Sequence, residues 1–387
     1  MSRFNQVFCG SVLSIVLLVS IFSICAYADS DETETGRFVR VYWYERDLEP
    51  LSGMSHTRRL RVNAPEVVLH SSFGNRSEVK ESGLALIRIE EDLRELESAE
   101  LYIELWGGHP GTANKRVTLN GRSTYYLPEV GTFLHNCTHS YPTIPLKITD
   151  LVNGFNAIQF ACDSGTSFWG HFIVDNTCLR LELKENHPDL MQAGLEEFKA
   201  SATARPAKHG NETILIQLRC DEKLRNNIEK VDYYGFYTSY DENGNGKRHD
   251  WHGMTKDREP YGILGTSDRA PFSLEWDTSM IPADEHARVR AVVHFKDRLK
   301  LLYETAPSEE FTIPKHENAK VTLVSSGDVP SPFWTRAGRK PHCTIVLDDV
   351  EQIERAVLHV VVWDGGKGEV ENPVTLNGVQ VDVVEEG

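Results

Sequence analysis

The segment DENGNG, which begins at Asp241, places oxygen-bearing side chains at alternate positions before a glycine. Asp241, Asn243 and Asn245 follow the order found in the first half of a calcium-binding loop, and Asp250 could add a carboxylate. A complete helix-flanked calcium loop has a glutamate at its twelfth position, where this chain has His252. Two interpretations follow: a solvated hairpin tip that needs Asn-Gly only for its backbone, and a structural Ca²⁺ bound by Asp241, Asn243, Asn245 and Asp250.

The residues that follow, HDWH, combine two imidazoles with a carboxylate. His249 and His252 beside Asp250 could bind zinc or transfer protons. The alternative, which we favour, is a surface segment that packs Trp251 against its own module.

Aromatic and polar residues near expected loops suggest a sugar-binding surface. Sugar C–H faces stack on aromatic rings, while polar groups bind the hydroxyls. The candidates are Trp106, His109, Tyr125, Trp169 and His171. Because Trp106 has a counterpart in Trp363, packing at a strand end is a second interpretation for that residue.

Catalytic signatures are absent from the sequence. It contains no G-x-S-x-G, no H-E-x-x-H, no phosphate-binding loop and no dinucleotide fingerprint. Paired carboxylates such as Asp348-Asp349 have polar neighbours, which is typical of turns and solvated faces. We predict no catalytic residue within this chain.

One part of the chain occurs twice without a gap. Glu97–Gly121 returns as Glu354–Gly378, with the same tryptophan and the same VTLNG block. A repeat of this length indicates one structural unit used twice. The first copy continues through GFNAIQFAC to LRLEL, whereas the second reaches Gly387 soon after VTLNG, so we expect an incomplete second unit and a longer protein.

Hydrophobic periodicity predicts strands in both copies. Leu101, Ile103 and Leu105 alternate with polar or aromatic residues, and Leu358 and Val360 keep the same phase. VTLNG is predicted to be a strand ending in a tight Asn-Gly turn, since both residues tolerate positive φ. Many short strands without a long helical period predict an all-β fold of several antiparallel β-sandwiches.

The repeated unit resembles the galactose-binding-like jelly roll of secreted carbohydrate-active proteins. The matching pieces are AELYIEL before Trp106, VTLNG at Val117–Gly121, the G-x-N segment within Ile144–Phe160, and LRLEL. Pro271–Phe295, with its W-D-T and its alternating R-A-V strand, resembles immunoglobulin-like or fibronectin-like modules of secreted enzymes. Both resemblances imply a fold and leave the function open.

These features divide the chain into five parts. We expect a signal peptide at 1–28, a galactose-binding-like sandwich at 29–185, a short helix and linker at 186–210, an immunoglobulin-like sandwich at 211–314, and an incomplete second galactose-binding-like sandwich at 315–387.

The N-terminal segment and the cysteines indicate export. Val12–Ile24 is apolar and is followed by the small-x-small site Ala26-Tyr27-Ala28, which is typical of a cleaved secretion signal. Export permits disulfides, and we predict that Cys162 pairs with Cys178, with Cys137 as a rival partner for either. No other stretch is apolar and long enough to cross a membrane.

The net charge of −16 opposes binding to nucleic acid, which requires a basic face. We therefore expect an exported or cell-surface, non-catalytic protein whose modules bind glycan or cell-surface polysaccharide. The alternatives are the accessory region of a secreted carbohydrate-active enzyme with its catalytic domain beyond residue 387, and a purely structural envelope protein.

Overall fold

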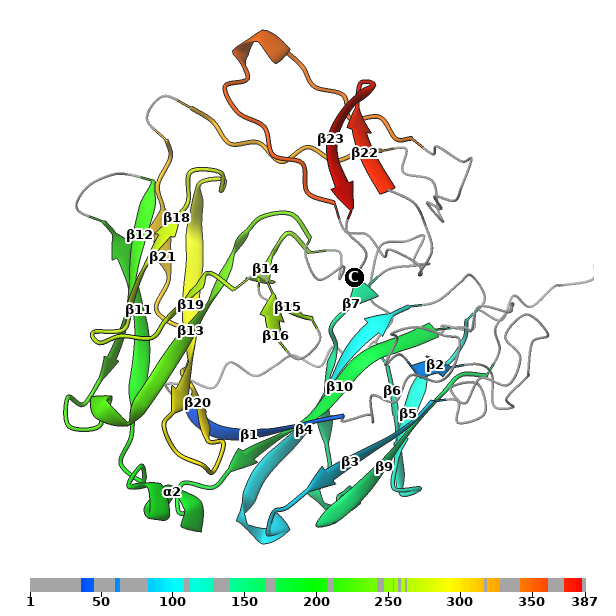
Figure 1. Ribbon diagram of the computed structural model, residues 1–387, viewed down its shortest axis with the longest axis vertical. Helices are drawn as coiled ribbons and strands as arrows, with labels where there is room; N and C mark the ends of the chain where they lie inside the picture. The colour runs from blue at the N-terminus through cyan, green and yellow to red at the C-terminus, as the bar shows by residue number, and fades with distance from the viewer. Residues whose placement is uncertain are drawn as a thin grey trace, which may run out of the picture. The chain divides into compact units, whose positions relative to one another are not determined.

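The computed structural model describes residues 36–44, 60–62, 83–107, 112–127, 139–163, 172–207, 212–241, 247–252, 254–256, 259–261, 263–316, 319–327, 342–360 and 372–384. Their regular structure is almost entirely β, in antiparallel sheets that form sandwiches, as predicted (Figure 1). None of the helices in these ranges is long and apolar enough to cross a membrane.

The first sandwich packs part of a large sheet against a four-stranded sheet. Its part of the large sheet has the order β1-β10-β4, with β2 beside β10 and with β7 and β8 beside β4. The smaller sheet has the order β3-β9-β5-β6. The bounds are β1 Arg37–Trp43, β2 Leu60–Val62, β3 Leu84–Ile89, β4 Leu96–Trp106, β5 Arg116–Leu119, β6 Ser123–Tyr126, β7 His139–Ser140, β8 Thr143–Leu146, β9 Gly154–Ala161 and β10 Phe172–Leu183.

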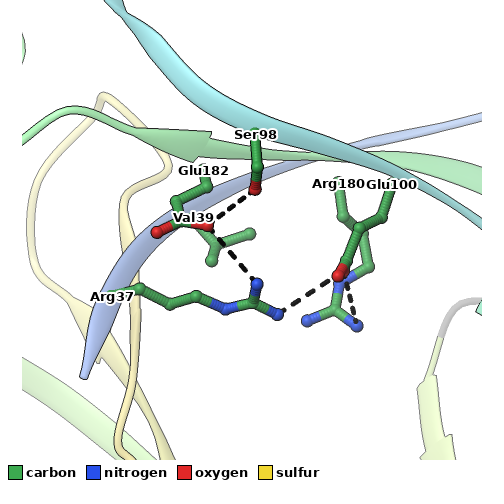
Figure 2. A pocket seen from close by; sticks show the side chains of 6 residues that line it. All are labelled: Arg37, Val39, Ser98, Glu100, Arg180 and Glu182. Atoms are coloured by element: carbon green, nitrogen blue, oxygen red, sulfur yellow. Dashed lines mark hydrogen bonds and ion pairs between the residues drawn. The ribbon is translucent and has the colours of Figure 1, made fainter. Parts of the chain in front are cut away.

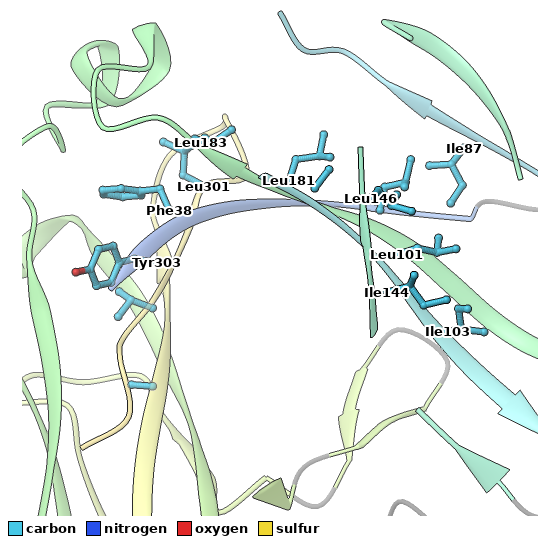
Figure 3. Packing of buried hydrophobic residues seen from close by; sticks show 14 of the residues in the cluster. Phe38, Ile87, Leu101, Ile103, Ile144, Leu146, Leu181, Leu183, Leu301 and Tyr303 are labelled. Carbon is cyan, nitrogen blue, oxygen red and sulfur yellow. The ribbon is translucent and has the colours of Figure 1, made fainter. Parts of the chain in front are cut away.

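The core of the first sandwich lies between these two sheets. Leu101 on β4 and Leu181 on β10 are buried on one side, and Ile87 on β3 meets them from the other (Figure 3). Strand residues of the opposite parity, such as Glu100 and Arg180, point away from this core because side chains alternate along a strand.

The second sandwich packs β14-β13-β19-β20 against a sheet of order β11-β12-β18. The ring of Tyr237 on β13 lies 4.8 Å from that of Trp276 on β18, and the Tyr233 hydroxyl donates to the Phe272 carbonyl at 2.5 Å. The bounds are β11 Ala200–Pro206, β12 Thr213–Cys220, β13 Ile228–Thr238, β14 His249–His252, β15 Met254–Lys256, β16 Glu259–Tyr261, β17 Gly265–Ser267, β18 Ser273–Asp277, β19 Asp284–Phe295, β20 Leu302–Glu304 and β21 Phe311–Ile313.

Strand β1 joins the two sandwiches into one continuous sheet. It pairs with β10 on one side and with β20 on the other, where Arg37 lies opposite Glu304. At this junction the ring of Phe38 lies 5.0 Å from that of Tyr303 (Figure 3). The ring of Phe198 contacts both. Buried aromatic rings therefore connect the two cores.

The segment after β10 differs from the predicted helix and linker. The expected helix is present as α2, Pro188–Ala193, which ends at Gly194 in the left-handed conformation (φ 65°). The residues expected to be linker instead include β11, which pairs along its whole length with β12. A linker was expected because proline often interrupts regular structure. Pro206 is nevertheless tolerated in β11, because this strand lies at the edge of its sheet.

The VTLNG block forms the predicted turn in both copies. In the first copy Asn120 and Gly121 connect β5 to β6 with φ values of 50° and 66°. In the second, Asn377 and Gly378 connect β22 (Asn372–Leu376) to β23 (Val379–Val384) with φ values of 50° and 85°. Positive φ at both positions is what a type I′ hairpin turn requires.

The other half of the repeat does not match. Residues 355–360 form no strand and expose Val357, Leu358 and Val360, although their first-copy counterparts lie in β4. The predicted second strand is therefore wrong for these residues, and Trp363 lies outside the described part. The physical difference is pairing: β4 is held by β8 and β10, and within the described ranges residues 355–360 have no such partner.

Asn156 connects the two motifs that carried the galactose-binding-like resemblance. Its buried amide oxygen accepts from Asn120 Nδ2 at 2.8 Å and from the Val152 amide at 2.9 Å. Asn120 Oδ1 in turn accepts from the Ala157 amide at 2.8 Å. The asparagines of VTLNG and G-x-N thus satisfy backbone groups that would otherwise be unpaired at the edge of the core.

Candidate functional site

The large sheet carries charged and aromatic side chains on the side opposite its core, which we call the polar face. The register of β4, β10 and β1 places Tyr102, Cys178 and Trp43 in one row, so side chains of this parity share a side. The residues of the polar face used below are Arg37, Trp43, Ser98, Glu100, Tyr102, Arg180, Glu182, Tyr234, Phe236, Trp251, Arg290 and Glu304.

The centre of the polar face is a network of arginines and glutamates (Figure 2). Arg37 contacts Glu304 at 3.1 Å, Glu100 at 3.4 Å and Glu182 at 3.5 Å. Arg180 also forms an ion pair with Glu304. The network therefore ties β1, β4, β10 and β20 together across the junction of the two sandwiches.

Glu304 stays ionised within this network. Burial alone raises the pKa of its carboxyl, but attraction by Arg180, Arg37 and Arg290 outweighs burial and lowers the pKa below its usual value. A carboxylate held by arginines in this way is a poor proton donor, so Glu304 itself does not have the raised pKa of the acid in glycoside hydrolysis.

The hollow among these charged side chains is small. Even with the open solvent at its mouth included, it measures only about 140 Å³, and it is lined by Arg37, Glu100, Arg180 and Glu182, together with Val39 and Ser98 (Figure 2). Small-molecule sites enclose roughly 300–1,000 Å³. A sugar therefore does not fit inside the network and can bind only on the surface of the polar face.

Aromatic rings lie on both sides of this network. On one side, the rings of Trp43 and Tyr102 meet edge to face at 5.9 Å. On the other, Trp251 on β14 lies 5.5 Å from Phe236, and the Arg290 guanidinium lies 4.6 Å above the Trp251 ring. All four rings belong to half-buried residues, so they are partly open to solvent.

Of the predicted sugar-binding residues, the structure describes Trp106 and Tyr125. Trp106 ends β4 and is half-buried, with the same parity as Tyr102, so it extends the polar face. Tyr125 lies on β6 in the other sheet. Its hydroxyl donates to Asp150 Oδ2 at 2.6 Å and accepts from the Lys147 amide at 3.0 Å, which makes it a structural contact. His109, Trp169 and His171 lie outside the described residues.

The predicted calcium loop connects β13 to β14. Thr238 pairs with His249, and the Ser239 amide donates to the Arg248 carbonyl, so the flanks are hairpin strands as the sequence suggested. Asp250 lies on β14, and its Oδ1 accepts from the Trp251 amide at 2.8 Å. Asn243 and Asn245 lie outside the described residues, so Ca²⁺ ligation by Asp241 and its neighbours stays a prediction.

The predicted disulfide between Cys162 and Cys178 is not formed, because both thiols are free in the structure. The prediction assumed that the two cysteines lie on adjacent antiparallel strands. Cys162 instead follows β9 in the smaller sheet, whereas Cys178 lies in β10 of the large sheet, between β1 and β4. Burial raises the pKa of the Cys162 thiol to about 11, and that of Cys178 also rises.

Sequence reasoning missed most of the polar face. It singled out Trp106 and Trp251 but neither Arg37, Arg180 nor Glu304. A signal was present in CLRLEL, where Arg180 and Glu182 alternate with leucines. What could not be read was that β1 and β20, more than 250 residues apart by their numbering, pair and bring these charges together.

Comparison with known proteins adds little. No family model matches the chain, and no curated protein matches it. Among solved structures, the glycoside hydrolase domain of Endo-D from Streptococcus pneumoniae R6 is similar with 8% identity, over 59% of this chain and 31% of that chain, at a TM-score of 0.26. This chain thus spans less than a third of that protein, and a TM-score this low supports no conclusion about activity.

Proposed function

We propose that this protein is an exported, non-catalytic glycan-binding protein that meets its ligand on the polar face. The observation that carries the proposal is the pair of aromatic groups, Trp43 with Tyr102 and Trp251 with Phe236, on either side of a charged network. Aromatic rings stack on sugar C–H faces, and arginines and carboxylates bind the hydroxyls. Trp43, Tyr102, Phe236 and Trp251 are themselves half-buried and so partly open to solvent.

Other features fit this proposal. A secretion signal at 1–28, outside the described residues, would bring the protein to the compartment where cell-surface glycans occur. The galactose-binding-like and immunoglobulin-like resemblances point to modules common in carbohydrate-active proteins. A structural Ca²⁺ at Asp241 would stiffen the loop between β13 and β14, next to Trp251.

The test is a glycan array probed with the full chain and with two variants, Trp251→Ala and Trp43→Ala. We expect the wild-type signal to fall by about fivefold or more in each variant, because stacking on one aromatic ring contributes on the order of 1 kcal/mol or more. The matched control is Phe155→Ala. Phe155 is 64% exposed on β9, outside the polar face, and Arg88 lies 5.8 Å from its ring.

A structural envelope protein is the second candidate. It is favoured by the charged network itself, in which Arg37 and Arg180 are held by glutamates of the same chain. A purely structural role, fixing the two sandwiches to each other, is sufficient to explain such a network. An array without signal for any sugar, from a wild-type protein that is folded by circular dichroism, would favour this role over glycan binding.

A further inference from the structure

Arg290 differs from the neighbouring arginines of the large sheet. Arg37 and Arg180 both contact Glu304, and Arg288, two residues before Arg290, forms an ion pair with Glu310 at 2.5 Å. Within the described residues, Arg290 has no carboxylate at ion-pair distance. Glu304 attracts it only from further away.

Two aromatic rings hold the Arg290 guanidinium in place. Its central carbon lies 4.6 Å from the centre of the Trp251 ring and 5.6 Å from that of Tyr234. Its Nε is buried without a hydrogen-bond partner among the described residues. Aromatic rings support a cation through their faces but accept no hydrogen bond in the guanidinium plane, so they do not satisfy the in-plane donors.

The positive charge of Arg290 is therefore only partly compensated within the described residues. Burial lowers the pKa of its guanidinium, and the attraction of Glu304 does not compensate. An arginine that the fold holds rigidly, desolvates and leaves without a carboxylate is arranged to receive one from outside.

We propose that Arg290 is an anion-binding subsite of the polar face, so that the preferred glycans carry one carboxylate or sulfate group. This inference rests on the proposed glycan-binding function and names its ligand class. The planar guanidinium binds either group through two parallel hydrogen bonds, while Trp251 stacks on the adjoining sugar ring. A single acidic group suits the site better than a polyanion, because the chain has a net charge of −16 and the neighbouring Arg37, Arg180 and Arg288 are ion-paired.

The experiment compares three related probes by calorimetry with the full chain: lactose, sialyllactose with its carboxylate, and lactose 6′-sulfate. We expect the wild type to bind one or both acidic probes at least tenfold more tightly than lactose, in a salt-dependent manner. Arg290→Gln should remove this preference, so that the variant binds neither acidic probe more tightly than lactose. Which acidic probe binds tells carboxylate recognition from sulfate recognition.

Two further variants make the test specific. Arg288→Gln, on the same strand and face, is the matched control and should bind as the wild type does. Arg290→Lys keeps the charge but loses the two-pronged donor geometry, so it should retain only part of the preference. If Arg290→Gln does not fold, this lysine variant still tests the inference.

The outcomes separate this inference from the proposed function. Equal binding of lactose and both acidic probes, unaffected by Arg290→Gln, would overturn the subsite while leaving glycan binding intact. If no probe binds, the melting temperature is measured in sodium sulfate and sodium glucuronate against sodium chloride at equal ionic strength. A rise specific to either anion that Arg290→Gln abolishes supports the subsite without a glycan, and the absence of such a rise overturns it.

Discussion

At the scale of single residues, Glu304 is the clearest case of chemistry created by the fold. Nothing in the local sequence Leu301–Ala306 distinguishes this glutamate from others in an acidic chain. Its role arises because β20 lies beside β1, which brings Arg37 and Arg180 to the same carboxylate. Its side chain is only 15% exposed, so removing its charge takes one carboxylate partner from each of two partly buried arginines.

We therefore predict that Glu304→Gln lowers the free energy of unfolding by about 3 kcal/mol at pH 7. The folded-state pKa of Glu304 lies below the usual value of 4.5, so the ionised form stabilises the fold above that pH. This contribution is lost as the pH falls from 4.5 through the folded-state pKa. The difference between variant and wild type should accordingly shrink in urea unfolding at pH 3.

The control for this prediction is Glu90→Gln, which breaks the exposed pair between Arg88 and Glu90. Exposed pairs contribute about 0–1 kcal/mol, so this variant should stay close to the wild type. A Glu304→Gln difference that is equal at pH 7 and pH 3 would show that the ionised carboxylate is not the source of the effect.

At the scale of elements, the Asn-Gly turn shows how far sequence alone can go. The dipeptide predicted a tight turn in both copies, and positive φ at Asn120 and Asn377 confirms it. The turn is a local property, set by which residues tolerate positive φ. The strand expected at residues 355–360 was wrong because a strand depends on partners that are distant in sequence.

The two copies of the turn provide a matched pair for mutation. Asn120→Ala should lower the free energy of unfolding by about 3 kcal/mol, because it strains a positive φ and leaves buried Asn156 without one of its partners. Asn377→Ala strains the same φ but removes no comparable contact in the described part, so about 1 kcal/mol is expected. Chemical denaturation of the full chain measures both.

Asn120→Gly separates the two causes, since glycine adopts positive φ without strain. This variant should retain most of the loss seen with alanine. Should it behave like the wild type, the asparagine side chain would contribute little, and the contact between VTLNG and G-x-N would not explain the motif.

At the scale of the whole molecule, the sequence predicted the kind of fold better than its arrangement. Period-two alternation in strands such as β4 and β13 was enough to predict antiparallel sandwiches. It was not enough to predict that β1 would join β10 to β20, or that β9 and β10 would lie in different sheets. Because the position of β1 was not predicted, the polar face was not recognised. Because β9 and β10 were expected to be adjacent strands, Cys162 was wrongly paired with Cys178.

The central claim is that the polar face is the binding surface, and nuclear magnetic resonance tests it most directly. The full chain is titrated with the oligosaccharide that gives the strongest array signal, and the indole N–H resonances of Trp43 and Trp251 are followed. We predict that these resonances and the amides near Arg290 shift with saturation, while the amides of Tyr126 and Phe155 on the smaller sheet stay in place. Shifts confined to the smaller sheet, with both indoles unchanged at saturating ligand, would contradict the claim.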